Sequence, residues 1–277
     1  GSLMHVAASG IRARVGRRKV ASAPRDSNVP PRCGGARLPG RFGRMIRLLA
    51  LDADDTLWHN EPVFTDTLAR FTELLRPHAA EAVIEQRLHD TEIRNLQHYG
   101  YGVKAFTLSM IETAVELTGG RVGGEEVREL LRMGREMLVA PVELLDGVRE
   151  AVAELARTWE LMLLTKGDLL DQETKLARSG LGEHFTHVEV VARKDRATYE
   201  RIVGAHGLAP REFVMVGDSL RSDVVPVAEM GGHAIHVPYA TSWAHERVEP
   251  VRLEGLRYLT VARIAQVGPV LRDLGSS

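Results

Sequence analysis

The chain has 277 residues, 44% of them hydrophobic and 26% charged, which suits a globular protein with one large domain or a core domain and a smaller partner. No apolar run approaches the roughly 20 residues that a membrane-spanning helix needs, so we expect no membrane role. The formal net charge of -1 hides an uneven distribution of charge along the chain.

The N-terminal segment, residues 1–44, is basic, with ten Lys and Arg residues and a single acid, Asp26. It is rich in Arg, Gly, Pro and Ser and lacks hydrophobic periodicity, so we expect it to be disordered. It has three interpretations: an organelle transit segment, a nucleic-acid-binding arm, or a tag and upstream sequence before a true start at Met45. We favour the third, because Met45 directly precedes the first convincing strand.

The remainder, residues 45–277, keeps 26 of the 36 basic and 36 of the 37 acidic residues, a charge of about -10. Acidic surfaces disfavour the phosphates of nucleic acid, so we expect no nucleic-acid partner. The only cysteine, Cys33, lies in the basic segment, so the remainder has no disulfide, no Cys-based zinc site and no catalytic thiol. This fits a reducing compartment, and we expect a cytoplasmic protein. The sequence leaves the oligomeric state open.

The first expected element is a short apolar run, Ile46–Leu51, which predicts a buried parallel strand that ends at Asp52. Between Glu61 and about Leu138 the pattern becomes helical, with four apolar stripes separated by short loops. We therefore predict a bundle of four helices inserted directly after the first strand.

From Pro141 onward, predicted helices alternate with predicted strands, which favours an α/β, Rossmann-like parallel sheet covered on both faces. We divide the chain into a core domain (45–60 and 140–277) and an inserted helical domain (61–139). The expected helices are 146–157, 171–179, 196–206, 221–230 and 261–274, and the expected strands are 160–164, 187–191, 212–216, 233–237 and 256–260.

Polar residues suited to phosphate chemistry follow these strands, at the edge where ligands bind in open parallel sheets. Crowded carboxylates repel each other unless a cation neutralises them, and Mg²⁺ accepts such oxygen ligands. Lys194, just past the third strand, is suited to balance a nucleophilic carboxylate, and Thr165 to donate a hydrogen bond to a phosphate oxygen. The acids of this edge are Asp52, Asp54, Asp55, Asp218 and Asp223.

In their order and spacing, these residues resemble the four motifs of the haloacid dehalogenase (HAD) superfamily. The motifs are Asp-x-Asp-x-Thr after a hydrophobic strand, a Thr or Ser that ends a strand, a Lys, and Gly-Asp-x(4)-Asp after a strand. The resemblance covers about residues 45–240 and implies that the helical insertion is the family's alpha-helical cap. The matching residues are, motif by motif, Asp52, Asp54 and Thr56; Thr165; Lys194; and Gly217, Asp218 and Asp223.

The resemblance implies a magnesium-dependent phosphatase that acts on a small phosphorylated metabolite, because the family's dehalogenases lack the second aspartate. Asp52 would attack phosphorus and form an aspartyl-phosphate. Asp54 would protonate the leaving oxygen and then activate the water that hydrolyses the intermediate. The family pattern would bind Mg²⁺ through the Asp52 side chain, the Asp54 backbone carbonyl and Asp218, with Asp223 as support.

Two departures from the family pattern affect these assignments. Asp55 stands where many members have Gly, which resembles a subset that includes nucleotide phosphatases. Lys194 is followed by Asp195, whereas the family often has Lys-Pro, so Lys166 and Lys175 are rivals for the role of the catalytic lysine.

The loop between the second and third predicted helices, residues 98–104, has glycines at alternate positions that permit close approach to a ligand. In similar caps this loop faces the catalytic site, so Tyr99, Tyr101 and Lys104 are candidates for substrate recognition. Trp58 is a further candidate. The alternative is an ordinary interhelical turn with surface aromatics, and a packing role for Trp58.

Three other functions stay open. A phosphotransferase or phosphomutase would use the same residues but exclude water from the intermediate. A non-catalytic binding protein would keep the fold, although the intact set of acids argues against it. A nucleic-acid role would depend on the basic segment.

Overall fold

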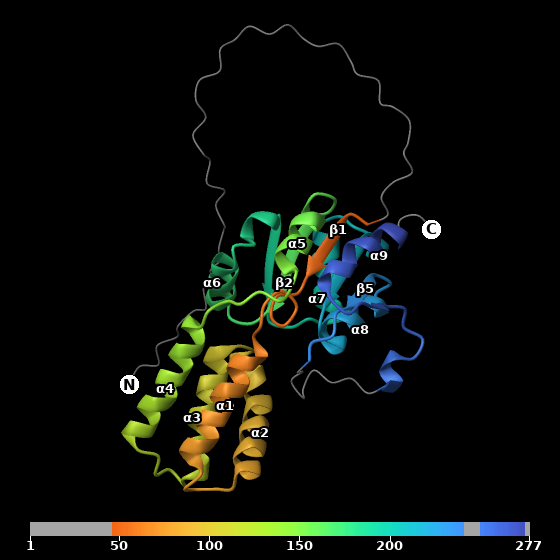
Figure 1. The fold of residues 1–277 in the computed structure, drawn as a ribbon. Coiled ribbons are helices and arrows are strands. Elements are labelled where there is room, and N and C mark those ends of the chain that lie inside the picture. The colour runs from red at the N-terminus through yellow and green to blue at the C-terminus, as the bar shows by residue number, and fades with distance from the viewer. Residues whose placement is uncertain (1–45, 241–249, 275–277) are drawn as a thin grey trace, which may run out of the picture. The chain divides into compact units, whose positions relative to one another are not determined.

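The structure, a computed structural model, describes residues 46–240 and 250–274; the basic segment 1–44 and its three interpretations lie outside these residues. The described part contains one six-stranded sheet in the order β3-β2-β1-β4-β5-β6, and every paired strand is parallel to its neighbour (Figure 1). The strands are β1 Leu48–Leu51, β2 Glu160–Lys166, β3 His187–Val191, β4 Phe213–Gly217, β5 His233–His236 and β6 Leu259–Thr260.

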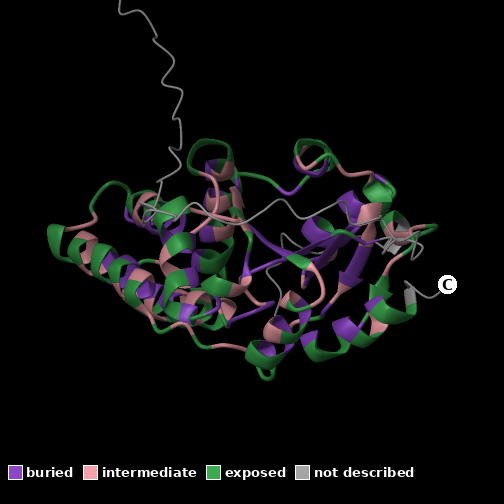
Figure 2. Cartoon of the chain, turned by 90° about the horizontal axis from the view of Figure 1, so that it is seen from above, coloured by how far each residue is buried: buried purple, intermediate pink, exposed green. Residues whose placement is uncertain are grey.

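The central strands are buried on both faces, which explains why they read as continuous apolar runs rather than alternating ones. In β1, Leu49 and Leu51 pack into one core and Leu48 and Ala50 into another. Figure 2 shows the buried strands between helices that are exposed on their outer sides. The covering helices are α5 Val148–Ala156, α6 Leu169–Ser179, α7 Arg196–Ala205, α8 Val225–Glu229 and α9 Val267–Leu274. The prediction of an α/β, Rossmann-like parallel sheet is confirmed.

Four helices lie between β1 and α5 in the chain and pack around a hydrophobic core of their own, in which Phe71, Ile84, Met110 and Leu130 are fully buried. We call α1–α4 the helical insertion. None of the described helices has the length and hydropathy to cross a membrane. The four helices are α1 Glu61–Leu75, α2 Glu81–Tyr99, α3 Val103–Leu117 and α4 Gly124–Val139.

The structure differs from the predicted elements mainly near prolines. The helix expected at 221–230 is a π-helical turn, η3 (Leu220–Val224), followed by α8, which has Pro226 in its first turn. The helix expected at 261–274 begins only at Val267, after the 3-10 turn η6 (Ile264–Gln266), because Pro269 is tolerated in a first turn but not in a helix interior. The remaining short turns are η1 Gly182–His184, η2 Pro210–Glu212 and η5 Pro250–Leu253.

Candidate active site

Three carboxylates meet at the carboxyl edge of the sheet. Asp52 directly follows β1, and Asp218 directly follows β4, which pairs with β1 so that Leu51 lies opposite Val216. Asp223 comes from η3, and the three side chains have carboxylate oxygens within 4.8 Å of one another. A Cβ atom at Gly217 would lie 2.2 Å from Asp223 Oδ2, so this approach requires glycine.

A fully buried lysine bridges two of these acids. Lys194 Nζ lies 2.6 Å from Asp52 Oδ1 and 2.7 Å from Asp223 Oδ1. Lys194 is held just before α7, whose N-terminus is capped by the Asp195 carboxylate, which accepts a hydrogen bond from the Thr198 backbone N–H. Asp195 thus fixes the start of this helix in the place where the family often has proline.

One lysine does not neutralise three buried carboxylates. Burial raises the pKa of Asp52 to about 7, although Lys194 opposes the shift. Burial, together with repulsion from Asp52 and Asp223, raises the pKa of Asp218 to about 9. A cation at this point would relieve the repulsion, and carboxylate oxygens are the ligands that Mg²⁺ prefers. The donor set therefore fits a magnesium ion.

Asp54 has a different environment from Asp52. Its carboxylate accepts hydrogen bonds from Trp58 Nε1 at 2.7 Å, Gln172 Nε2 at 2.8 Å and Lys175 Nζ at 3.0 Å. Burial alone would raise the pKa of Asp54, but the Lys175 charge and the three donors outweigh it and lower the pKa. Asp54 is therefore held as a carboxylate.

The two residues after Asp54 shape the loop. Asp55 has a φ of 61°, a left-handed conformation that glycine adopts without cost and aspartate tolerates. Its carboxylate accepts hydrogen bonds from the backbone N–H groups of Asn60 and Glu61, so it anchors the start of α1. Thr56 Oγ1 accepts a hydrogen bond of 3.0 Å from the Asp218 backbone N–H, which ties the loop after β1 to the loop after β4.

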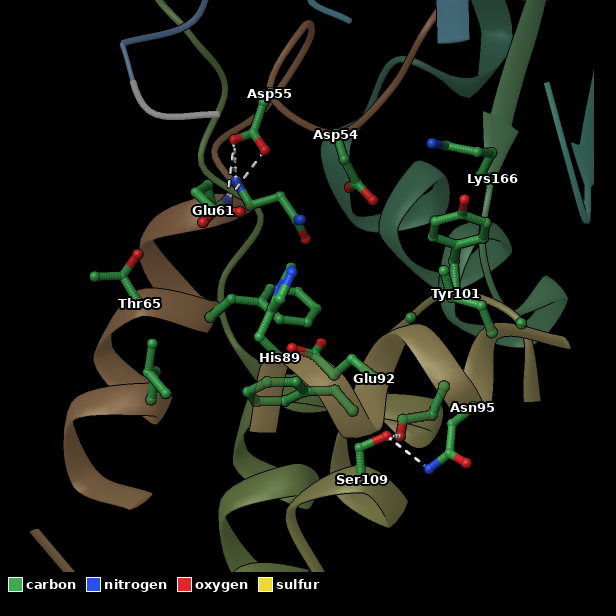
Figure 3. A pocket seen from close by; sticks show the side chains of 18 of the residues that line it. Asp54, Asp55, Glu61, Thr65, His89, Glu92, Asn95, Tyr101, Ser109 and Lys166 are labelled. Carbon is green, nitrogen blue, oxygen red and sulfur yellow. Dashed lines mark hydrogen bonds between the residues drawn. The ribbon is translucent and has the colours of Figure 1, made fainter. Parts of the chain in front are cut away.

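A cavity of about 810 Å³ extends from these acids to α1, α2 and α3 (Figure 3). Thr165, which is almost fully buried near the end of β2, lines it, and so does Tyr101. Gly102, with a φ of 108°, brings the loop before α3 close to the start of α6: a Cβ there would lie 3.4 Å from the Asp168 backbone N. The loop therefore approaches the candidate site.

The model of the haloacid dehalogenase-like hydrolases matches residues 46–231, which include every motif residue described above. The chain belongs to this family. The predicted resemblance to the HAD superfamily is confirmed, and the family's activities make this chain a hydrolase.

Known relatives of this HAD-like hydrolase include enzymes of different chemistry. A phosphoserine phosphatase of Thermus thermophilus is 30% identical over 227 residues, which is 69% of this chain and 88% of the relative. The crystal structure of a HAD-like hydrolase from Xanthomonas campestris is 39% identical, with a TM-score of 0.76 over 86% of this chain and 95% of that one. A 2-haloacid dehalogenase from Pseudomonas syringae, 20% identical with a TM-score of 0.55 over 83% and 99%, shares the fold.

The three candidate lysines of this hydrolase have different partners. Lys194 contacts Asp52, whereas Lys175 contacts Asp54. Lys166 Nζ donates a hydrogen bond to Ser222 Oγ at 2.9 Å and lies 4.4 Å from the centre of the Tyr101 ring. The role predicted for the catalytic lysine is to balance the charge of Asp52. Among the three lysines, Lys194 is the one that contacts Asp52.

The predicted substrate-recognition residues do not all line the cavity. Tyr101 does, but Tyr99 is 52% exposed and is not among the lining residues. Lys104 forms an ion pair with Asp168 instead, at 2.8 Å, and the ring of Trp58 is buried behind Asp54.

Sequence reasoning missed the residues that line most of the helical wall. Glu85, His89 and Glu92 of α2 lie at intervals of four and three, so they share one face of that helix and all line the cavity. Glu61 of α1 also lines it. A polar stripe inside a bundle was the signal that could have identified this face.

Proposed function

We propose that the chain is a magnesium-dependent phosphatase that hydrolyses a small phosphate monoester through an aspartyl-phosphate at Asp52. The observation that carries this proposal is the pairing of two aspartates with different surroundings. Asp52 contacts Lys194 and two further acids, whereas Asp54 is bound by three hydrogen-bond donors. A dehalogenase needs no such second carboxylate.

In the first step, an Asp52 carboxylate oxygen attacks phosphorus and forms a new O–P bond. The ester P–O bond breaks, and its electron pair stays on the leaving oxygen, which takes up a proton. Lys194 and Thr165 hold the phosphoryl oxygens, and Asp52, Asp218 and Asp223 would hold Mg²⁺, which supplies positive charge against the phosphate.

In the second step, water attacks phosphorus, Asp54 accepts a proton from it, and the bond between phosphorus and Asp52 breaks to release inorganic phosphate. The three donors to Asp54 lower its pKa and so keep it ionised, the form that can accept this proton. In the first step Asp54 must act as an acid, although it is held as a carboxylate. It therefore has to take up a proton from the substrate, whose phosphate group would bind as the monoanion. The helical insertion acts as the cap that encloses the ester.

The relationship to a phosphoserine phosphatase supports phosphate ester hydrolysis, and the cavity volume of about 810 Å³ supports a small substrate. The test is hydrolysis of an aryl phosphate with Mg²⁺, which EDTA should abolish. Asp52→Asn should lower kcat by at least about 10³-fold because an amide is a poor nucleophile, whereas Asp66→Asn, an exposed change on α1, should not. Full activity of Asp52→Asn contradicts the mechanism, and transfer of phosphate to an added alcohol instead of water indicates a phosphotransferase.

A further inference from the structure

The wall of the cavity that the helical insertion provides carries two partly buried carboxylates, Glu61 and Glu92, without a cationic partner among the described residues. Glu61 and Glu92 both line the cavity (Figure 3), and both are largely shielded from solvent. Among the described residues, neither forms an ion pair with a Lys, Arg or His side chain. Burial raises the pKa of each to about 7, with repulsion from Asp55 acting on Glu61 and repulsion from Glu61 acting on Glu92.

A third polar group of the cavity, the side-chain amide of Gln172, has an acceptor oxygen without a hydrogen-bond donor among the described residues. Gln172 is 2% exposed and lines the cavity, and its Nε2 donates to Asp54. Its Oε1 atom is buried and has no hydrogen-bond partner among the described residues. A buried acceptor without a donor is costly, so a ligand with N–H groups would relieve it.

The cations of the cavity lie at its other end. Lys175 is bound to Asp54 and Asn60. Lys166 donates to Ser222, and its Nζ lies 4.4 Å from the centre of the Tyr101 ring, in the loop before α3. No arginine is found among the described residues that line the cavity. The lysines of the cavity therefore lie beside the acids of the sheet edge. Among the described lining residues, the carboxylates of α1 and α2 have no lysine or arginine beside them.

Apolar side chains also line the cavity. Phe64 and Phe106 line the cavity with ring centres 5.1 Å apart, and Leu68 and Leu96 lie on the same wall. Such a surface suits a hydrocarbon chain and offers nothing to a second anionic group.

We propose that the ester cleaved at this site carries a cationic amine on its leaving group, and that the amine binds the carboxylates of Glu61 and Glu92. This inference rests on the proposed phosphatase function and narrows its substrates to zwitterionic phosphate monoesters with a short hydrocarbon spacer. Among the described residues, the helical wall offers a substrate carboxylate no Lys or Arg side chain, and its His89 lies on the same face as Glu85 and Glu92, so amino alcohol phosphates are preferred to amino acid phosphates.

The test compares ω-aminoalkyl phosphates with ω-hydroxyalkyl phosphates of equal length, from roughly two to six carbons, alongside an aryl phosphate. At the best length, kcat/KM for the amine should exceed that for the alcohol by at least about 10-fold. Glu92→Gln and, separately, Glu61→Gln should reduce this ratio toward one. Glu81→Gln, an exposed change on the same helix as Glu92, should leave the ratio unchanged.

The outcomes separate the two proposals. Hydrolysis of the aryl phosphate with equal rates for amine and alcohol overturns the inference and leaves the phosphatase function intact. Failure to hydrolyse any ester overturns the function, and calorimetric titration of the intact protein then decides the inference. Tighter binding of the amine, lost in Glu92→Gln, supports it, whereas equal binding or none overturns it.

Discussion

At the scale of single residues, the contacts of Lys194 determine how the candidate site is held together. Its side chain is fully buried between Asp52 and Asp223. Lys194→Met removes the cation and leaves two buried acids facing each other, which should cost about 3–5 kcal/mol of unfolding free energy near neutral pH. The cost should shrink as the pH falls below about 7, because burial raises the pKa of Asp52 to about 7 and its protonation removes one of the two facing charges. Urea denaturation at several pH values measures it.

The matched control is Lys104→Met. Its ion pair with Asp168 is half exposed, so its loss should cost at most about 1 kcal/mol and be reduced by salt. If Lys194→Met lowers the free energy of unfolding by as little as Lys104→Met does, then the buried ion pairs of Lys194 do not stabilise the fold.

The meeting of Asp52, Asp218 and Lys194 was predictable, because the carboxyl ends of neighbouring parallel strands share one edge of the sheet. The surroundings of Asp54 were not. Gln172 and Lys175 lie three residues apart on α6 and reach Asp54 from more than a hundred positions along the chain. Only the packing of α6 against the sheet brings them there, and no local pattern encodes that packing.

At the scale of elements, α2 combines two roles. Ile84 and Leu88 are buried in the core of the helical insertion, while Glu92 faces the cavity. The apolar stripe predicted that α2 is a helix, because helical periodicity can be recognised in the sequence without knowing which elements pack against the helix. It did not predict the cavity face, since the shape of a cavity depends on how α1 and α3 pack beside α2.

The pKa of Glu92 gives α2 a measurable pH dependence. Burial, the larger cause, and repulsion from Glu61 together raise the pKa of Glu92 from 4.5 to about 7. The unfolded chain therefore ionises at lower pH than the native state, so ionisation destabilises the fold increasingly as pH rises from 4.5 to about 7. Glu92→Gln removes this cost, and its stability relative to wild type should grow by about 3 kcal/mol between about pH 4.5 and 8.

Thermal or urea denaturation of Glu92→Gln at several pH values checks this sign. Glu81→Gln, which is exposed on the same helix, should show no such trend. A Glu92→Gln variant that becomes less stable than wild type as the pH rises would mean that Glu92 has a cationic partner in the free protein.

At the scale of the whole molecule, the sheet edge contributes acids and lysines to one cavity, the helical insertion contributes the carboxylates of Glu61 and Glu92, and the candidate metal site lies at the sheet edge. Mg²⁺ should stabilise the native protein, because the proposed ion would find the three acids assembled only in the folded chain. At about 100 times its dissociation constant the gain should be about 2.7 kcal/mol, seen as a higher Tm. Asp218→Asn should lose most of this gain, and Asp66→Asn should keep it. An equal gain in both variants would place the ion elsewhere.

The position of β1 sets the shortest chain that should fold. β1 is the central strand, paired with β2 on one side and β4 on the other, and it begins at Leu48, while the family match begins at residue 46. Removal of residues 1–44 should therefore change kcat/KM by less than about twofold. It should change Tm by no more than about a few degrees relative to the full chain. Removal of residues 1–51 deletes β1 and should abolish the cooperative unfolding transition. A loss of activity in the shorter deletion would instead give the basic segment a role in substrate binding or catalysis.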